Sequence, residues 1–227
     1  MTIGFRIAAR TRQVSAAQIA AFRAIPVANV SDCMSRLSAG GPRLRPVHTS
    51  GGMSGPALTV RTRPGDNLMV HKALDLAEPG DIIVVDAGGD LTNAIIGEIM
   101  QSYAIKRQLG GIVINGSVRD VLALRAGSLP VFAAGVSHRG PYKDGPGEIN
   151  VAISIDGMVI EPGDLVIGDD DGMLCVPFGD VDAVLQAAKA KQAAEEVQMA
   201  DIQAGRSDRS WVDATLRRLG CDMGREG

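Results

Sequence analysis

Two short apolar runs, each ending in polar residues, limit what this chain can fold into. The first is Asp81–Asp86 (Asp-Ile-Ile-Val-Val-Asp), and the second runs from Gly111 to Ile114. Runs of this length, rich in β-branched residues, are typical of buried strands, and a segment with helical character, Thr92–Gln108, separates them. Strand, helix and strand in this order predict a parallel βαβ unit. We therefore expect an α/β fold with a central sheet flanked by helices.

Helices and hairpins are expected on either side of this unit. Ser15 is a suitable cap for a helix over Ala16–Ile25 that Pro26 would end, and a second helix is expected over Ser31–Leu37. Asp156-Gly157 between two apolar runs predicts a tight β-hairpin. The expected strands are Ala57–Val60, Ile82–Val85, Ile112–Ile114, Val131–Ala133, Val151–Ile155, Met158–Ile160, Leu165–Ile167 and Met173–Val176, and the other expected helices are Leu68–Ala77 and Val121–Ala126.

A long helix is expected near the end of the chain, from a cap at Asp180 to about Ile202. Its inward stripe, at spacings of three and four residues, is Val181, Leu185, Ala188, Gln192, Glu195, Met199 and Ile202. The polar residues Gln192 and Glu195 interrupt this stripe, which favours a subunit contact or an active site there. We predict a single compact domain over residues 1–227, with N-terminal helices within residues 1–40 and the C-terminal helix over residues 180–204 at a subunit contact.

Composition argues against several classes of function. The formal net charge is −3 and aromatic residues are 3% of the chain, so a nucleic-acid surface is not expected. No apolar run approaches the roughly 20 residues that span a bilayer. Cys33, Cys175 and Cys221 are far apart and odd in number, which fits neither a disulfide framework nor a C-x-x-C metal site. We expect a cytoplasmic protein that binds neither nucleic acid nor membranes.

Ligand-binding groups are expected where the two central strands end, because ligands of α/β folds gather where strands end and helices begin. Gly97 lies between these strands, and a glycine lets the backbone come close to a ligand. If a helix begins there, the free amides of Gly97, Glu98, Ile99 and Met100 form an anion site. This segment is therefore a candidate site for an acidic substrate.

Arg119 and Asp120 follow the second strand and offer two kinds of chemistry within one turn. A guanidinium can pair with a carboxylate or a developing enolate oxygen. A carboxylate can hold a hard divalent cation, and Glu98 could join it through water. The alternative is structural: Asp120 caps the helix at Val121, and Arg119 is a solvated surface charge.

The spacing of Glu98 from Arg119-Asp120 resembles the acidic-residue–x20–Arg-Asp signature of a family of class II pyruvate aldolases. This family acts on 4-hydroxy-4-methyl-2-oxoglutarate and 4-carboxy-4-hydroxy-2-oxoadipate, and it includes the regulator of ribonuclease activity A. Its aldolases more often have Asp where this chain has Glu98. The resemblance spans most of the chain and also includes Gly65-Asp66-Asn67, Gly80-Asp81, Asn115–Val118, Gly140–Asn150 and Pro162-Gly163-Asp164.

The resemblance implies a swivelling β/β/α fold and a role for each residue of the signature. Asp120 would bind Mg²⁺ or Mn²⁺, and Glu98 would hold a water molecule of the metal. Arg119 would contact the keto oxygen of a 2-oxo acid whose carboxylate is received by the backbone from Gly97 to Met100. The resemblance also implies a homotrimer or a dimer of trimers, in which Glu195, or Glu196, reaches a neighbour's site.

Several further residues are open to two interpretations. His71 lies on an expected helix near the site and is either a functional or a structural histidine. Lys143 and Asp144 lie in a Gly/Pro-rich loop that either covers the site or is a plain surface loop. Asp32 is expected to cap a helix or to line the pocket. The run Asp169–Gly172 lacks the ligand pattern of a calcium loop and predicts a hairpin turn.

The resemblance, taken with these patterns, implies a metal-dependent lyase that cleaves a 4-hydroxy-2-oxo acid to pyruvate and also decarboxylates oxaloacetate. No side chain is an obvious acid or base, and a Schiff-base lysine is disfavoured because Lys72, Lys106 and Lys143 lie outside apolar strands. A competing hypothesis is a non-catalytic protein that inhibits an RNA-degrading enzyme. A methyltransferase is disfavoured because the chain lacks the G-x-G-x-x-G loop.

Overall fold

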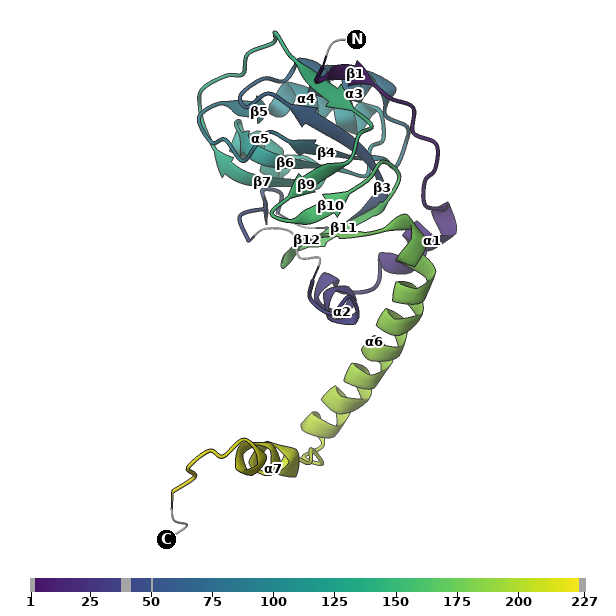
Figure 1. The fold of residues 1–227 in the computed structure, drawn as a ribbon, viewed down its shortest axis with the longest axis vertical. Helices are drawn as coiled ribbons and strands as arrows, with labels where there is room; N and C mark the ends of the chain where they lie inside the picture. Colours follow the sequence, from purple (N-terminus) through teal and green to yellow (C-terminus); the bar gives the residue numbers. More distant parts are fainter. Residues whose placement is uncertain (1–2, 38–41, 50, 225–227) are drawn as a thin grey trace. The chain divides into compact units, whose positions relative to one another are not determined.

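A computed structural model describes residues 3–37, 42–49 and 51–224. Its backbone contacts divide the chain into two compact units, Met1–Ala188 and Lys189–Gly227, whose helices and strands are labelled in Figure 1. The division falls inside the long helix that the sequence predicts. The single domain predicted for residues 1–227 stays a prediction. Among the described helices, none combines the length and the apolar character needed to cross a membrane.

The first unit is an α/β structure and contains the sheet. Its elements are β1 (Phe5–Ile7), α1 (Ala16–Phe22), α2 (Val27–Cys33), β2 (Arg45–Pro46), β3 (Met53–Thr62), α3 (Leu68–Leu76), β4 (Ile82–Asp86), β5 (Ala94–Ile96), α4 (Glu98–Lys106), β6 (Gly111–Val118), α5 (Val121–Ala126), β7 (Val131–Val136), β8 (Gly147–Ile149), β9 (Ile153–Ile155), β10 (Met158–Ile160), β11 (Leu165–Asp169), β12 (Gly172–Val176), the short 3-10 helix η1 (Phe178–Asp180) and the start of α6 (Val181–Gln203). The second unit holds the rest of α6 and α7 (Ser210–Arg218).

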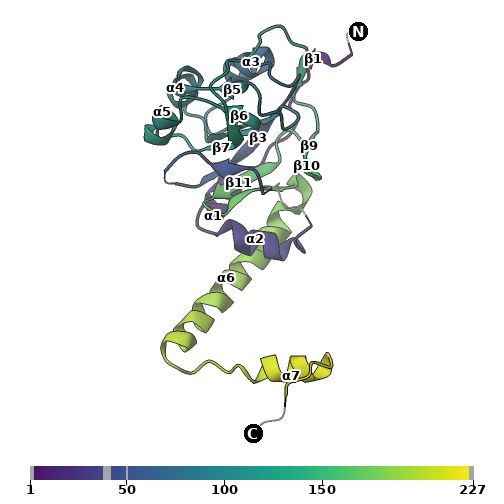
Figure 2. The same cartoon turned by 90° about the vertical axis from the view of Figure 1, so that its left-hand side faces the viewer.

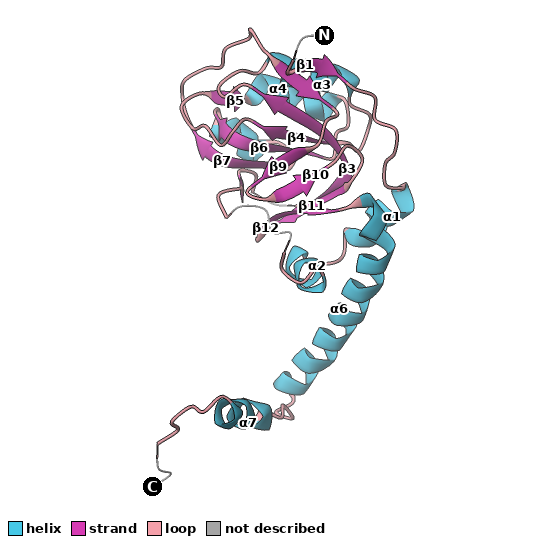
Figure 3. Cartoon of the chain, viewed as in Figure 1, coloured by secondary structure: helices cyan, strands magenta, loops and turns pink. Residues whose placement is uncertain are grey.

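The strands of the main sheet follow the order β1-β8-β3-β4-β6-β7-β2. Figure 3 shows its central strands β3, β4, β6 and β7. The neighbours β3 and β4, β4 and β6, and β6 and β7 are parallel, which confirms the βαβ arrangement predicted from the sequence. The later strands form antiparallel hairpins, β9 with β10 and β11 with β12. In parallel neighbours the carboxyl ends meet at one edge, so the ends of β4 and β6 lie side by side.

Apolar side chains cover both faces of the central strands. In β4, Ile82 and Val84 belong to one hydrophobic core, and Ile83 and Val85 belong to the other. This alternation follows from the two-residue period of a strand, and burial on both faces explains why β4 reads as an unbroken apolar run. The second core also takes buried side chains from α3, α4 and α5, which lie on that face of the sheet (Figure 2).

Most of the predicted elements are confirmed. The eight predicted strands are present, although β3 and β6 are each several residues longer than predicted, and the helix Val121–Ala126 is found as predicted. Ser15 forms a capping box with Gln18 at the start of α1. The turn at Asp156-Gly157 joins β9 to β10. The long helix α6 also agrees with the prediction, and within it Lys191 and Glu195 form an ion pair at 2.9 Å.

Three helix predictions are wrong in their limits. The helix expected over Ala16–Ile25 is α1, which already ends at Phe22. The helix expected over Ser31–Leu37 is α2, which runs from Val27 to Cys33. Pro26, which the sequence predicts to end the preceding helix, is instead the residue just before the first turn of α2. Asp32 lies inside α2 and therefore does not cap it. At the start of this helix, the Val27 amide donates instead to the carboxylate of Asp169 at 2.9 Å. Residues 38–40 of the predicted N-terminal helical region lie outside the described residues.

The helix expected over Thr92–Gln108 begins only at Glu98, because the preceding residues form β5, which pairs with β6. Strands β1, β2, β5 and β8 and helix α7 were not predicted. The four strands are only two or three residues long and depend on distant partners, as β1 does on β8. The late start of α4 places the first turn of this helix beside the end of β6, where the candidate site lies.

Candidate active site

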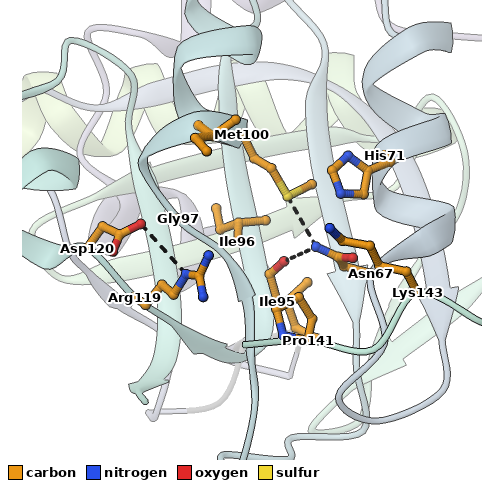
Figure 4. A pocket seen from close by; sticks show the side chains of 11 residues that line it. Asn67, His71, Ile95, Ile96, Gly97, Met100, Arg119, Asp120, Pro141 and Lys143 are labelled. Atoms are coloured by element: carbon orange, nitrogen blue, oxygen red, sulfur yellow. Dashed lines mark hydrogen bonds and ion pairs between the residues drawn. The ribbon is translucent and has the colours of Figure 1, made fainter. Parts of the chain in front are cut away.

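A small open cleft of about 110 Å³ lies at the carboxyl end of β6 (Figure 4). It is formed by β5, the end of β6, the first turn of α4, the first turns of α3 and a loop after β7. Its lining residues are Asn67, His71, Ile95, Ile96, Gly97, Ile99, Met100, Arg119, Asp120, Pro141 and Lys143. The cleft therefore brings together most of the residues that the sequence marks as candidates, from segments far apart in the chain.

Arg119 and Asp120 form one wall of the cleft, directly after β6. Their side chains are 42% and 43% exposed, and Arg119 Nε lies 3.7 Å from Asp120 Oδ2. The backbone of Asp120 is left-handed (φ +56°), a conformation that Asp tolerates better than most residues. Asp120 occupies the cap position of α5, but its side chain makes no capping hydrogen bond there. Instead, Oδ2 accepts a hydrogen bond from the Glu98 amide at 3.0 Å.

Gly97 makes this contact between β6 and α4 possible. A Cβ atom at Gly97 would lie 2.3 Å from Asp120 Oδ2 and 3.0 Å from Arg119 Cγ, far inside normal contact distances. The backbone at Gly97 is extended, so its requirement for glycine comes from space alone. The close approach predicted for Gly97 is therefore present, and it is an approach to the Arg119-Asp120 pair.

The amides at the start of α4 are only partly free to bind an anion. The sequence predicts free amides at Gly97, Glu98, Ile99 and Met100, but the Glu98 amide is taken by Asp120. The hydrogen bonds within the helix begin with the Gln101 amide, which donates to the Gly97 carbonyl at 3.1 Å. The amides of Ile99 and Met100 remain in the first turn for an anion.

The side chain of Glu98 does not follow its amide towards Asp120. This side chain is exposed at the start of α4, and Glu98 does not line the cleft. Glu195 lies on α6, in the second unit. Asp32 pairs with Arg36 at 2.8 Å and is not among the residues that line the cleft. Of the predicted site residues, the cleft thus includes Gly97, Ile99, Met100, Arg119, Asp120, His71 and Lys143.

The opposite wall is formed by Asn67, His71 and Lys143. Asn67 Nδ2 donates to the Ile95 carbonyl at 2.8 Å and contacts Met100 Sδ at 3.3 Å, which fixes the orientation of the amide. Asn67 Oδ1 is buried and has no hydrogen-bond partner within the described residues. Sequence reasoning missed Asn67 as a site residue, although its place just before an apolar helix is a signal for a helix start.

His71 lies one helical turn after Asn67 on α3, and its amide donates to the Asn67 carbonyl at 3.0 Å. Burial lowers the pKa of His71, the positive charge of Lys143 lowers it further, and Asp75 partly opposes both effects. The pKa of His71 therefore lies below the ordinary value of 6.5, and the imidazole is neutral at pH 7.

The loop that carries Lys143 is fastened by Asp66, a fully buried carboxylate. Asp66 accepts hydrogen bonds from the amides of Asp144 at 2.7 Å and Gly145 at 2.9 Å, and it pairs with Arg63 at 3.0 Å. The Asn67 amide also donates to the Tyr142 carbonyl at 3.0 Å. These contacts hold the loop against the start of α3, so the loop is a fixed wall of the cleft.

The side chains that could hold a metal ion in this cleft are few. The described residues form no group of three or more His, Cys, Asp or Glu side chains suited to a metal ion. Asp120 is the carboxylate that lines the cleft, and it is almost half exposed. Mg²⁺ keeps several waters and commonly binds through one or two carboxylates plus substrate oxygens, so a lone accessible carboxylate fits this ion.

The fold and the cleft define a class of α/β protein with an open cleft where parallel strands end and a helix begins, the usual place for ligands in such folds. The model of the RraA-like family, described as Aldolase/RraA, matches residues 27–175. This chain belongs to that family, as the resemblance indicated.

Relatives of the chain differ in their names. A protein of Halalkalibacterium halodurans named "Putative 4-hydroxy-4-methyl-2-oxoglutarate aldolase" is 42% identical over 178 residues, which are 78% of this chain and 85% of the relative. The structure of an uncharacterized protein from Pseudomonas syringae matches with a TM-score of 0.77 at 24% identity, over 86% of this chain and 96% of that one. The RNA-processing inhibitor RraA from Thermus thermophilis matches with a TM-score of 0.61 at 27% identity, over 67% and 92%.

Proposed function

We propose that this protein is a divalent-metal-dependent lyase that cleaves a 4-hydroxy-2-oxo acid, of the 4-hydroxy-4-methyl-2-oxoglutarate type, to pyruvate and a second carbonyl compound. Oxaloacetate decarboxylation is the proposed side activity, because loss of CO₂ from oxaloacetate gives the same pyruvate enolate. One observation carries the proposal: Arg119 and Asp120 line a single cleft beside the amides of α4. The name of the relative at 42% identity supports the same reaction.

The chemical problem is the negative charge that develops when the C3–C4 bond breaks. The electrons are left on a pyruvate enolate, which is high in energy in water. Arg119 places a fixed positive charge in the cleft, where it can pair with the enolate oxygen. The amides of Ile99 and Met100, at the positive end of α4, can receive the carboxylate of the 2-oxo acid.

Asp120 is the residue that would hold Mg²⁺ or Mn²⁺. Its carboxylate is kept in place by the Glu98 amide, so one of its oxygens has a fixed position while the side chain stays accessible. When bound there, the cation would supply Lewis-acid stabilisation of the enolate. We also propose that the exposed carboxylate of Glu98 assists through water, as the family resemblance implies.

His71 is the side chain in the cleft that can accept a proton at neutral pH. Among the cleft residues, Arg119 and Lys143 are cationic and Asp120 is the proposed metal ligand. The lowered pKa of His71 keeps its imidazole neutral. We assign His71 to take up the C4 hydroxyl proton during cleavage and to return a proton to the enolate carbon.

We further propose a cytoplasmic homotrimer or dimer of trimers that acts on a small 2-oxo acid and binds neither nucleic acid nor membranes. In this assembly Glu195, or Glu196, would reach the cleft of a neighbouring subunit. Size-exclusion chromatography with light scattering measures the assembly. A strictly monomeric protein with full activity would contradict the role of Glu195.

The proposed function is tested by pyruvate release from 4-hydroxy-4-methyl-2-oxoglutarate, followed with lactate dehydrogenase. Activity should require Mg²⁺ or Mn²⁺ and stop with excess EDTA, and oxaloacetate decarboxylation should behave in the same way. The variant Asp120→Ala should lose metal-dependent turnover while its circular dichroism spectrum stays unchanged. Full activity of this variant would remove the assignment.

A second candidate function rests on the likeness to the RNA-processing inhibitor RraA. In that case the chain would act by contacting an RNA-degrading enzyme and would not need a metal-binding carboxylate. The same variant separates the two functions, because Asp120→Ala should abolish lyase activity and leave inhibition of such an enzyme unchanged.

A further inference from the structure

The N-terminal segment of residues 5–12, which we call the strap, runs along the first unit from β1 towards α1 (Figure 1). Its first three residues form β1, which pairs in parallel with β8 at the edge of the sheet. Within this pair Arg6 binds the buried carboxylate of Glu148 at 2.8 Å. After β1, the Ala8 amide donates to the Ile149 carbonyl at 3.0 Å. The strap is therefore the outermost strand beside β8.

Two turns with the same sequence lie under the other end of the strap. Both read Glu-Pro-Gly-Asp, at residues 78–81 and at residues 161–164. In each turn the Asp amide donates to the Glu carbonyl at 3.1 Å, and the glycine has a positive φ (+90° and +86°), as in a type II turn. The Asp carboxylate in turn accepts a hydrogen bond from the Glu amide, at 2.8 Å and 2.9 Å. The two turns thus present a carboxylate in the same way.

Each turn binds one arginine of the strap. Arg10 donates to Asp81 at 2.7 Å, and Arg12 pairs with Asp164 at 3.4 Å. Each arginine also pairs with the glutamate of the same turn. Asp81 and Asp164 are only 1% and 2% exposed, and among the described ion pairs these arginines are their cations. Because a buried carboxylate without its cation is strongly unfavourable, the two turns hold the strap in place.

The first residue of the strap touches the loop that carries Lys143. A Cβ atom at Gly145 would lie 3.5 Å from the ring of Phe5 and 3.6 Å from Leu68, so the ring lies directly beside Gly145. Gly145 follows Lys143 by two residues, and β8 begins two residues later. Leu68 is the first residue of α3, next to Asn67 of the cleft. The strap therefore reaches the cleft wall from behind.

We propose that the strap positions this wall of the cleft. With both arginines on their turns, Phe5 stays against Gly145, and the loop keeps Lys143 beside His71. Release of the strap frees the base of the loop, so that Lys143 moves away from the imidazole. The strap residues are positioning residues, because the cleft lining includes none of them.

The first experiment follows hydrogen–deuterium exchange in the full-length protein. Phe5→Ala removes the ring beside Gly145 and leaves every ion pair of the strap intact. The amides of residues 142–146, which include those that Asp66 binds, should then exchange about tenfold faster or more. Ile3→Ala is the matched control, since Ile3 is 98% exposed and lies outside β1. Unchanged exchange of the loop in Phe5→Ala would overturn the proposal.

The arginine variants test the other end of the strap. Arg10→Gln and Arg12→Gln should speed exchange of the strap and of the loop together, and Arg10→Lys, which keeps the charge, should restore both. Arg23→Gln is the control, because Arg23 is exposed and lies after α1. Faster exchange of the strap with an unchanged loop would give the strap a purely structural role and overturn the proposal. Should an arginine variant fail to fold, as judged by circular dichroism, Phe5→Ala still decides.

The imidazole of His71 gives a second readout. Burial and then the charge of Lys143 lower its pKa, while Asp75 raises it. Further charged side chains line the spaces around His71 but belong to elements outside the loop: Lys106, Arg107 and Arg119. Opening of the loop wall weakens both lowering effects, so NMR titration should show a higher pKa of His71 in Phe5→Ala and in Arg10→Gln. The same pKa in the wild type and both variants would overturn the proposal.

Exchange and NMR titration need no catalysis, and only the effect of the strap on activity rests on the proposed function. If His71 accepts the proton, the acidic limb of kcat/KM should move to higher pH in Phe5→Ala. A wild type that releases no pyruvate would reject the lyase, and exchange and titration would still judge the strap. An active lyase whose loop exchange and imidazole pKa are unchanged in Phe5→Ala would reject the strap alone.

Discussion

The carboxylate of Asp120 accepts a hydrogen bond from the backbone amide of Glu98 at 3.0 Å, and this bond joins the end of β6 to the start of α4. The two residues are 22 positions apart, and the contact exists only because Gly97 has no side chain. The Asp120 carboxylate is thereby turned away from α5, the helix it directly precedes, and towards the cleft.

The first prediction concerns Gly97→Ala. The new methyl group would lie 2.3 Å from Asp120 Oδ2, so Asp120 must move. A displacement of about 1 Å at a reacting centre typically lowers activity about 100-fold, and we expect at least this loss in kcat/KM for pyruvate release. Gly179→Ala is the control, because a Cβ atom there meets nothing within 4 Å. An active Gly97→Ala variant would mean that the position of Asp120 is unimportant.

A second prediction concerns the charge of Arg119. Replacement by Gln keeps a hydrogen-bond donor but removes the positive charge that we propose pairs with the enolate. Loss of one such donor usually lowers kcat about 10²–10³-fold, and we expect a loss of this size for both lyase and decarboxylase activities. The exposed Arg125, at the end of α5, supplies the control Arg125→Gln. A change in KM alone would assign Arg119 to binding only.

The loop that holds Lys143 gives a third prediction. Asp66→Asn removes the charge that accepts hydrogen bonds from the Asp144 and Gly145 amides. Hydrogen bonds to a charged group contribute about 1.5–3 kcal/mol, so the free energy of unfolding in urea should fall by about 2–3 kcal/mol. Asp144→Asn is the control, since the Asp144 side chain is 75% exposed. An unchanged unfolding midpoint for Asp66→Asn would show that other contacts fix the loop.

The fourth prediction is the pH behaviour of His71. Burial and then Lys143 lower its pKa, and Asp75 raises it. In Lys143→Gln the pKa of His71 should therefore rise, and in Asp75→Asn it should fall further. NMR titration of the imidazole measures both directions. If His71 accepts the proton, activity falls as the pH drops through this pKa, so the acidic limb of kcat/KM should move to higher pH in Lys143→Gln. A limb that stays in place would exclude His71 as that group.

The central part of the fold could be predicted because its signals are local. The apolar run of β4 is buried on both faces, and Val121–Ala126 has a clear boundary after Asp120. The segment Ala94–Ile96 was predicted as helix because its strand character comes from pairing with β6, a contact that a window of sequence does not contain. The strands β1 and β8 form in the same way, with partners more than 100 residues apart.

The site residues that could be predicted stand at a recognisable strand end, helix or loop. Arg119 and Asp120 follow a strand directly, and the cleft includes both. The amide of Glu98 was expected to be free, and its use by Asp120 depends on a turn geometry that the sequence does not reveal. Asp66 and its loop amides are 78 and 79 residues apart, so their contact was beyond reach of a local pattern.

The two carboxylates that fasten the cleft, Asp120 and Asp66, share no bonding partner. Asp120 joins the end of β6 to the start of α4, and Asp66 holds the loop that carries Lys143. The two walls of the cleft are therefore held independently, so a substitution at Lys143 can alter the loop wall without displacing Asp120.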